Sequence, residues 1–235
     1  MKFHSPLVKG TLVKRYKRFM ADVTLADGTA VTAHCANSGS MLSVNEPGSE
    51  VWISPAQNPD RKLKWTWELI RVGETLVGIN TSLPNAIVAE AIEAGRIPEL
   101  TGYETLKREV KYGQNSRIDI LLDDATRGRC YVEIKNVTMR RNLVDGPLEF
   151  PDGVTSRGAK HLVELADMVD QGHRAVMFYL CQREDGDRFE IAGDIDPAYA
   201  DGLEEARMKG IEVLCYRCAV SPKEITVSDP VAVAC

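Results

Sequence analysis

The segment SRIDILLDDATRGRCYVEIKNV, residues 116–137, decides the fold because it contains two apolar strands joined by a polar turn. We predict strands over 118–123 and 129–136 with the turn centred near residue 126, so that Asp119 and Glu133 lie opposite each other. Glu133 and Lys135 are two residues apart and therefore share one face of their strand. The segment predicts two acids and one amine on a common surface.

Such a triad has the composition of a divalent-metal site. Opposed carboxylates repel each other and raise each other's pKa unless a positive charge lies between them. Mg2+ or Mn2+ accepts carboxylate oxygens, keeps several waters and leaves positions for a phosphate. Lys135 would orient or deprotonate the attacking water, or neutralise charge on the phosphate. The alternative is a surface hairpin on which Lys135 bridges the two acids, an interaction worth about 0.2–1 kcal/mol.

The overall composition is that of a globular protein of one large or two smaller domains, with 235 residues of which 44% are hydrophobic. No apolar run approaches the length of a membrane span, and the start of the chain lacks a signal-peptide core, so we expect a cytoplasmic protein without a membrane partner. Cysteines 35, 130, 181, 215, 218 and 235 are scattered, which predicts reduced core thiols. The CxxC of Cys215 and Cys218 lacks the two further close ligands that zinc requires.

Charge is distributed unevenly along the chain, whose formal net charge is −5. Residues 1–80 contain ten Lys or Arg and seven Asp or Glu, whereas residues 81–235 contain 19 and 27. The N-terminal part is therefore the expected nucleic-acid surface, on which basic groups contact phosphates and aromatic rings stack on bases. The alternative is a set of half-buried strands with Trp in the core. The candidate contacts are Lys9, Lys14, Arg15, Lys17, Arg18, Lys62, Lys64 and Trp65.

Hydropathy and turn signals predict two domains. In residues 1–80 short strands alternate with Gly, Asn and Pro turns, a pattern typical of a small five-stranded oligonucleotide-binding barrel. In residues 81–235 a helix near 84–95 is followed by three strands, a helix, a buried strand, a third helix and a last strand. This order predicts a mixed sheet flanked by helices. We interpret Asn85 as a helix cap, with a phosphate contact as the alternative.

Arranged in this way, the residues resemble the PD-(D/E)XK nuclease superfamily, whose core carries an Asp on the second strand and a Glu-x-Lys on the third. Asp119, Glu133 and Lys135 match this pattern, with an isoleucine in place of the motif's proline. The resemblance implies a further acid on the first helix, for which Glu90 is our choice and Glu93 the competitor. The implied catalytic set is Asp119, Glu133, Lys135 and Glu90, with the three acids as ligands of Mg2+ or Mn2+.

At closer range the chain resembles the sugar fermentation stimulation protein A family. The resemblance rests on HCANSGSM (34–41), GINTSLPNAIVAEAI (78–92), FPDGVTSRGAKHLVEL (150–165) and GIEVLCY (210–216), together with the hairpin. It implies an oligonucleotide-binding barrel joined to a nuclease-like domain, DNA binding without strong sequence preference, and a role in regulating sugar utilisation, maltose in particular. A helix-turn-helix has been proposed near the C-terminus of this family, but here one helix is followed by a strand pattern.

The same resemblance gives a meaning to the helix predicted after residue 154. Thr155 or Ser156 can cap it, and its first turns carry Lys160 and His161. In nucleases of this fold the second helix lies beside the site, so Lys160 would contact a phosphate and His161 would orient a water. The alternative for His161 is a structural histidine beside an apolar helix face.

Together these features predict a DNA-binding protein with a divalent-metal-dependent nuclease site. A non-catalytic, sequence-nonspecific DNA-binding regulator would need the basic barrel but no metal site. A small-molecule phosphoesterase would have a closed pocket and a substrate affinity that is indifferent to salt, whereas polynucleotide binding weakens steeply as salt rises.

Overall fold

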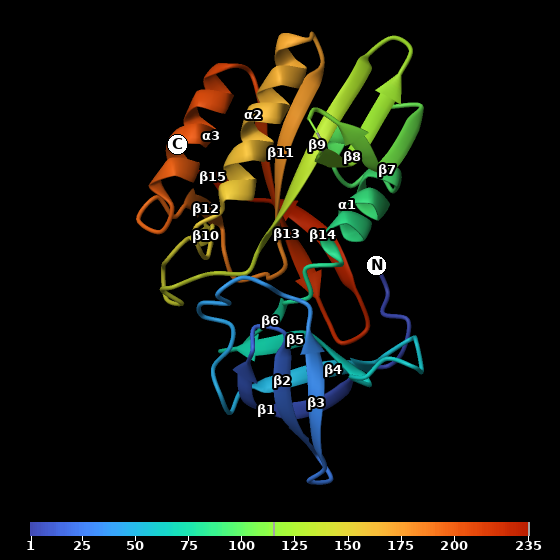
Figure 1. Ribbon diagram of the computed structural model, residues 1–235, viewed down its shortest axis with the longest axis vertical. Helices are drawn as coiled ribbons and strands as arrows, with labels where there is room; N and C mark the ends of the chain where they lie inside the picture. Colours follow the sequence, from blue (N-terminus) through green and yellow to red (C-terminus); the bar gives the residue numbers. More distant parts are fainter. Residues whose placement is uncertain (115, 235) are drawn as a thin grey trace.

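The computed structural model describes residues 1–114 and 116–234, so Cys235 lies outside the described residues. Figure 1 shows a barrel formed by the N-terminal part of the chain at one end of the molecule and a larger sheet-and-helix domain at the other. The two-part α+β architecture predicted from the sequence is confirmed.

The N-terminal part is a closed barrel. Its strands are hydrogen-bonded in the order β3-β2-β1-β4-β5-β6, and β3 also pairs in parallel with β5, which closes the sheet over β1–β5. Leu12, Val23, Ile53 and Trp67 fill the interior and are almost fully buried. The strands are β1 (Val8–Tyr16), β2 (Met20–Leu25), β3 (Ala30–Cys35), β4 (Glu50–Pro55), β5 (Trp65–Val72) and β6 (Thr75–Gly78).

The second domain is built on a six-stranded mixed sheet in the order β14-β13-β11-β9-β8-β7. The central strand β11 runs parallel to β9 and β13, and the other pairs are antiparallel. The sheet strands are β7 (Thr105–Tyr112), β8 (Ser116–Asp124), β9 (Gly128–Val137), β11 (Arg174–Cys181), β13 (Glu212–Val220) and β14 (Ile225–Pro230).

Helices cover both faces of this sheet, as Figure 1 shows. One face packs on α1 (Pro84–Glu93), and the other packs on α2 (Ser156–Asp170) and α3 (Pro197–Met208). Two features had no clear signal in the sequence, the short helix η1 (Pro98–Leu100) and the small sheet of β10 (Leu148–Phe150), β12 (Arg188–Ile191) and β15 (Ala232–Val233). β13 follows α3 directly, so residues 212–220 form a strand and not a recognition helix.

Local signals explain where the helices begin and end. Pro84 starts α1, and Gly95, with a left-handed φ of 69°, stops it. The cap predicted for Asn85 is wrong, because the residue before α1 is Leu83 and no side chain caps the helix. At α2 the Thr155 side chain accepts a hydrogen bond from the Gly158 N–H.

The register of the β8–β9 hairpin agrees with the prediction. The pairs Ile120↔Val132 and Asp123↔Arg129 centre the turn on residue 126. The ladder stops at Ile120↔Val132, one position before Asp119 would meet Glu133. There the Asp119 carboxylate itself accepts a hydrogen bond from the Ile134 N–H at 2.7 Å. A side chain therefore satisfies a backbone donor where the two strands begin to separate.

The two domains share packed contacts. Trp52 and Leu69 of the barrel belong to the same hydrophobic cluster as α1 and the large sheet. The Gly78 N–H donates to the Gln182 carbonyl at 2.8 Å. The chain start also lies against the second domain, since the Met1 amine donates to the Ile225 carbonyl at 2.7 Å. The first residues thus precede the barrel in sequence but contact the other domain in space.

The prediction of reduced core thiols is confirmed for the described cysteines, which are all buried and free: Cys35, Cys130, Cys181, Cys215 and Cys218. In the part of the chain that the structure describes, no helix is long and apolar enough to cross a membrane.

Candidate metal and nucleic-acid site

Two members of the predicted triad, Glu133 and Lys135, are in contact where β9 passes beneath α2. The Lys135 Nζ lies 2.9 Å from Glu133 Oε1, and His161 of α2 binds the same carboxylate oxygen through Nδ1. Glu133 is nearly inaccessible, with 3% of its side chain exposed, while 13% of the Lys135 side chain remains exposed. The strand alternation of β9 and one turn of α2 thus bring the Glu133, Lys135 and His161 side chains to one point.

His161 has polar partners at both ring nitrogens. The Arg157 Nε donates to His161 Nε2 at 3.4 Å, which requires a lone pair on Nε2. The tautomer with its proton on Nδ1 donates to Glu133, and the Lys135 Nζ lies 3.4 Å from the same Nδ1. His161 acts on Glu133 as a fixed hydrogen-bond donor, so its orientation is set by groups on both sides.

Asp119 is held from two directions. Its Oδ1 accepts a hydrogen bond from Asn85 Nδ2 at 2.8 Å, and its Oδ2 accepts one from the Ile134 N–H at 2.7 Å. Burial and the nearby charge of Glu133 raise the pKa of Asp119 to about 6. At neutral pH the carboxyl is mostly ionised, but its negative charge is only partly compensated by the protein.

The pKa of Glu133 is shifted in the opposite direction. Burial opposes its ionisation, but the hydrogen bond from His161 and the charge of Lys135 outweigh burial and lower its pKa. Its second oxygen, Oε2, is buried and has no hydrogen-bond partner. A buried carboxylate oxygen without a partner costs about 1–3 kcal/mol or more unless something fills its place.

These donors fit a hard divalent cation. Asp119 and Glu133 supply carboxylate oxygens, and one of those oxygens is unsatisfied. Among the described residues no group of three or more His, Cys, Asp or Glu side chains is placed to hold a metal ion, so the protein offers at most two such ligands here. Mg2+ suits such an open arrangement because it commonly takes one or two carboxylates and completes its shell with water and phosphate.

The structure does not bring Glu90 to this site, so its predicted role is corrected. Glu90 Oε1 binds the amine of Met1 at 2.9 Å, and 59% of the Glu90 side chain is exposed. Asn85, five residues earlier on the same helix, reaches Asp119 instead. Five residues rotate a helix by about 140°, so the two side chains leave α1 in different directions.

Sequence reasoning missed three residues around the site. Glu109 on β7 accepts a hydrogen bond from Asn85 Nδ2 at 2.8 Å and has a left-handed φ of 55°. The buried Tyr112 hydroxyl and both buried carboxylate oxygens of Glu164 have no hydrogen-bond partner. Burial, together with the charges of Glu133 and Glu164, raises the Tyr112 pKa. No motif marked these residues, because they read as ordinary positions of an exposed strand and an amphipathic helix.

Several of the predicted basic contacts are engaged within the protein. Lys9 pairs with Glu50, and Lys14 lies 3.9 Å from Asp22. Arg15 donates to four backbone carbonyls, three of them in the 37–40 loop, at distances of 2.9–3.2 Å. Arg15 therefore fixes this loop.

The other predicted contacts differ in their exposure and in their hydrogen-bond partners within the protein. Lys17 and Arg18 are exposed at the β1–β2 turn, where both have left-handed backbones. Trp65 is half-buried against the barrel core, which supports the alternative reading of that ring. Lys62 is exposed, whereas the exposed Lys64 donates to the Pro59 carbonyl at 2.5 Å and the exposed Lys160 donates to the Gln114 carbonyl at 3.1 Å.

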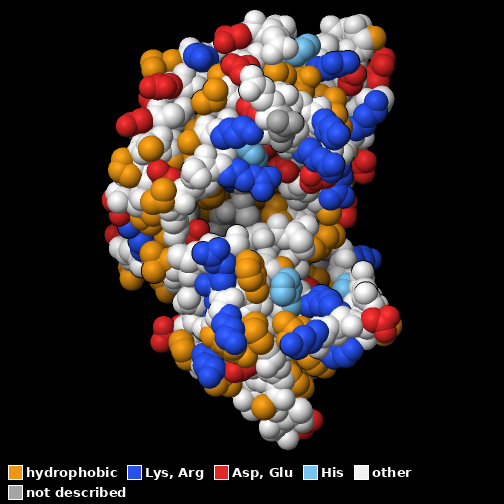
Figure 2. Space-filling model, viewed as in Figure 1, with side chains coloured by type: hydrophobic (Ala, Val, Ile, Leu, Met, Phe, Trp, Pro, Cys, Tyr) orange, Lys and Arg blue, Asp and Glu red, His pale blue; other side chains and the backbone are white. Residues whose placement is uncertain are grey.

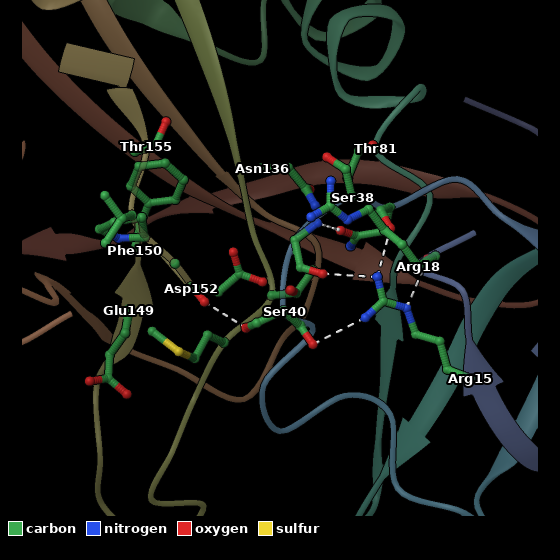
Figure 3. Close-up of a pocket in the computed structure, with 17 residues that line it drawn as sticks. Arg15, Arg18, Ser38, Ser40, Thr81, Asn136, Glu149, Phe150, Asp152 and Thr155 are labelled. Atoms are coloured by element: carbon green, nitrogen blue, oxygen red, sulfur yellow. Dashed lines mark hydrogen bonds between the residues drawn. The ribbon is translucent and has the colours of Figure 1, made fainter. Parts of the chain in front are cut away.

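A cleft of about 670 Å3 separates the barrel from the second domain. Arg18 and Ser38 line it from the barrel side, and Asn136, Phe150 and Thr155 line it from the other, as Figure 3 shows. In Figure 2 the same region is a hollow with Lys and Arg side chains on both of its sides. The triad does not line the cleft, but Asn136 follows Lys135 directly on β9.

A rim contact joins the two walls of this cleft. Asp152 accepts hydrogen bonds from the Ser40 hydroxyl at 2.6 Å through its carbonyl and from the Met41 N–H at 2.9 Å through its carboxylate. A Cβ on Gly39 would lie 2.5 Å from that carboxylate, so any other residue here would displace the Asp152 side chain. The two walls of the cleft are therefore joined by hydrogen bonds next to the loop that Arg15 fixes.

The fold and site define a two-domain protein in which an oligonucleotide-binding-type barrel precedes a restriction-endonuclease-like domain. The two halves match the family profiles described as "SfsA N-terminal OB domain", over residues 13–79, and "Sugar fermentation stimulation protein RE domain", over residues 82–224. The chain belongs to the sugar fermentation stimulation protein family.

Individual relatives agree with this assignment. The sugar fermentation stimulation protein homolog of Rhodospirillum rubrum is 65% identical over 230 residues, which cover 94% of each chain. The homolog of Rhodospirillum centenum is 62% identical over 228 residues, 97% of each chain. The solved structure of Pyrococcus furiosus SfsA in complex with Ca2+ superposes with a TM-score of 0.87 at 24% identity, covering 100% of this chain and 98% of the other. This last likeness shows that the whole two-domain fold is shared.

Proposed function

We propose that this chain is a DNA-binding protein with a divalent-metal-dependent nuclease site. The observation that carries the proposal is the convergence of Asp119, Glu133 and Lys135, in which a buried Glu133 oxygen has no partner. The solved Pyrococcus furiosus relative contains Ca2+, a hard cation of the class that these oxygens suit. We propose Mg2+ or Mn2+ as the working ion.

In this proposal Asp119 and Glu133 hold the ion, which would polarise a phosphodiester and lower the pKa of a bound water. Lys135 lies beside Glu133 and would place its ammonium against the attacked phosphate or the attacking water. His161 keeps the Glu133 carboxylate ionised and oriented through its Nδ1 proton. Each residue therefore has a role that its contacts support.

The barrel and the cleft would provide DNA binding. Arg18 and Lys17 are exposed at the barrel turn, and Arg18 also lines the cleft. These groups suit a phosphate backbone and do not depend on base sequence. The family name connects its members with sugar fermentation, and we propose that binding to DNA is how this chain acts on sugar utilisation, including that of maltose.

Cleavage assays test the proposal directly. Labelled single- and double-stranded DNA and RNA would be incubated with Mg2+ or Mn2+ and with wild type, Glu133→Gln or Lys135→Ala. We expect metal-dependent cleavage by wild type and a loss of at least about 100-fold in each variant, with binding retained in fluorescence anisotropy. If no substrate is cut and all three proteins bind equally well, the chain is a DNA-binding regulator on a nuclease fold.

Salt dependence separates DNA from a small phosphoester as the ligand. The affinity for a polynucleotide should fall steeply as salt rises, because bound phosphates release counterions. A small-molecule phosphoesterase would show little change over the same range, and this result would contradict the assignment of DNA.

A further inference from the structure

Two basic side chains face each other across the β7–β8 pair. Lys111 of β7 is directly opposite Arg117 of β8, and both side chains are exposed. Like charges in this position destabilise a strand pair. In the part of the chain that the structure describes, neither side chain has a hydrogen bond or an ion pair, whereas Lys9, Arg129 and Arg174 are each paired with an acid. The repulsion between Lys111 and Arg117 is therefore not relieved by any of the described acids.

Protection of the sheet edge does not explain this pair. Charged side chains on an edge strand hinder pairing with other chains, and β7 is an edge strand of the large sheet. Lys107, Arg108 and Lys111 of β7 can all serve that purpose. Arg117 cannot, because it lies on β8, which stands between β7 and β9 in the sheet order. The second basic group therefore needs another reason.

The turn between these two strands borders a hollow of about 340 Å3. Lys111 and Arg117 line it together with Tyr112, Gly113 and Ser116, so no acid is among the described residues that line it. The Ser116 hydroxyl has no hydrogen-bond partner within the described part of the chain. An ammonium, a guanidinium and a hydroxyl can all donate hydrogen bonds, so the hollow has the lining of an anion site.

The turn lies beside the proposed metal site. Lys160 of α2 donates to the Gln114 carbonyl at 3.1 Å, which holds the turn against that helix. Arg117 precedes Asp119 by two residues on β8, about 7 Å along an extended strand. In the sheet order β9, which reaches the cleft at Asn136, is followed by β8 and then by β7. The hollow therefore lies beyond Asp119 when the sheet is followed from the cleft toward β7.

We propose that the hollow at the β7–β8 turn binds a backbone phosphate of the nucleic acid through Lys111, Ser116 and Arg117. A phosphate between the two basic groups removes their repulsion, and the Arg117 guanidinium can bind two of its oxygens at once. The inference rests on the proposed DNA binding and adds a second contact to that of the barrel. Figure 2 shows Lys and Arg side chains gathered on the second domain above the cleft, on the same face of the molecule. Nucleic acid held at both places would have its backbone fixed on either side of the proposed cleavage position.

DNA binding without metal tests this site. The affinity of the full chain for a labelled single-stranded oligonucleotide would be measured by fluorescence anisotropy in EDTA at several salt concentrations. Lys111→Gln and Arg117→Gln should each lower the affinity about fivefold and make the slope of log affinity against log salt concentration smaller by about 0.7. Lys209→Gln is the matched control and should leave both values unchanged. It removes an exposed lysine at the end of α3, across the domain from β7 in Figure 1.

Thermal unfolding separates a phosphate contact from a structural role. Each substitution removes one of two opposed charges, so both variants should unfold at or above the wild-type temperature. A lower unfolding temperature with normal DNA binding would overturn the proposal, because the pair would then serve the sheet. Wild-type affinity and slope in both variants would also overturn it, and would leave the proposed DNA binding intact. Absence of DNA binding by wild type would overturn the proposed function itself.

A terminal phosphate is the other source of the same chemistry. Oligonucleotides with a 5′-phosphate and with a 5′-hydroxyl should lose affinity equally in Arg117→Gln, because the proposed contact is to the backbone. A loss confined to the phosphorylated oligonucleotide would overturn the assignment to a backbone phosphate.

Discussion

Replacing Asp119 by Asn should make the metal-free protein more stable at neutral pH. Burial and the charge of Glu133 raise the Asp119 pKa from 3.8 to about 6, so the folded state holds this proton more tightly than the unfolded chain does. Stability from this group is fully present below pH 3.8 and is lost as the pH rises through 6. At 1.36 kcal/mol per pKa unit, the full loss is about 3 kcal/mol.

The substitution also removes one hydrogen-bond acceptor. The Asp119 carboxylate accepts hydrogen bonds from Asn85 and from the Ile134 N–H, and an amide has only one oxygen to replace both acceptors. Such a loss costs about 1 kcal/mol. We therefore expect Asp119→Asn to raise the free energy of unfolding by about 1–2 kcal/mol at pH 8.

Urea unfolding in EDTA at pH 4.5 and pH 8 provides the measurement. Circular dichroism at 222 nm is the suitable signal, because α1, α2 and α3 all lie in the second domain whereas Trp52, Trp65 and Trp67 report on the barrel. Between the two pH values the difference between variant and wild type should shift by about 2 kcal/mol in favour of the variant.

The control for this experiment is Asp123→Asn, which changes an acid on the same strand that pairs with Arg129 at 3.6 Å outside the site. This variant should show no comparable shift between the two pH values. A difference between Asp119→Asn and wild type that is the same at pH 4.5 and pH 8 would refute the reasoning, because burial and the charge of Glu133 would then not raise the Asp119 pKa. Added Mg2+ should stabilise wild type and reverse the order at pH 8.

Two further predictions concern the barrel. Arg15→Ala should lower the free energy of unfolding of the barrel by about 2–3 kcal/mol, because four backbone carbonyls lose a charged donor. Trp fluorescence during urea unfolding measures this change. An unchanged midpoint would show that the 37–40 loop keeps its conformation without Arg15. Arg18→Ala should leave the unfolding midpoint of the barrel unchanged but weaken the binding of single-stranded DNA. The slope of log affinity against log salt concentration should become smaller by about 0.7. An unaltered slope would show that Arg18 is not part of the proposed DNA surface.

The hairpin was predictable because its determinants are local. A polar turn between two apolar strands fixes the register, and the register fixes which side chains share a face. Asp119, Glu133 and Lys135 could therefore be placed together from the sequence. The start and end of α1 and the start of α2 were local too, since Pro84, Gly95 and Thr155 act within one helical turn.

The contact of Asn85, and not Glu90, with Asp119 was not predictable, because it depends on how α1 is rotated against the sheet. Most of α1 is apolar, with Ile87, Val88, Ala91 and Ile92 buried, so the periodicity does not say which polar residue faces β8. A left-handed backbone at Glu109 has no sequence signal either, because that conformation normally points to Gly or Asn. The partners of Arg15 were hidden for a similar reason, since they are carbonyls of a loop 22–25 residues away.

Two structural elements, β9 and α2, connect the cleft with the buried Glu133 carboxylate. On β9, Glu133 and Lys135 belong to the triad, and the next residue, Asn136, lines the cleft. On α2, the capping residue Thr155 lines the cleft, and His161 lies almost two turns farther along the helix. Both elements run from the cleft to the same buried carboxylate. A DNA strand held between the barrel and the second domain would therefore lie within a few residues of Glu133 along either element. In the proposed function the barrel would thus determine which phosphate is presented, without contacting the proposed metal site itself.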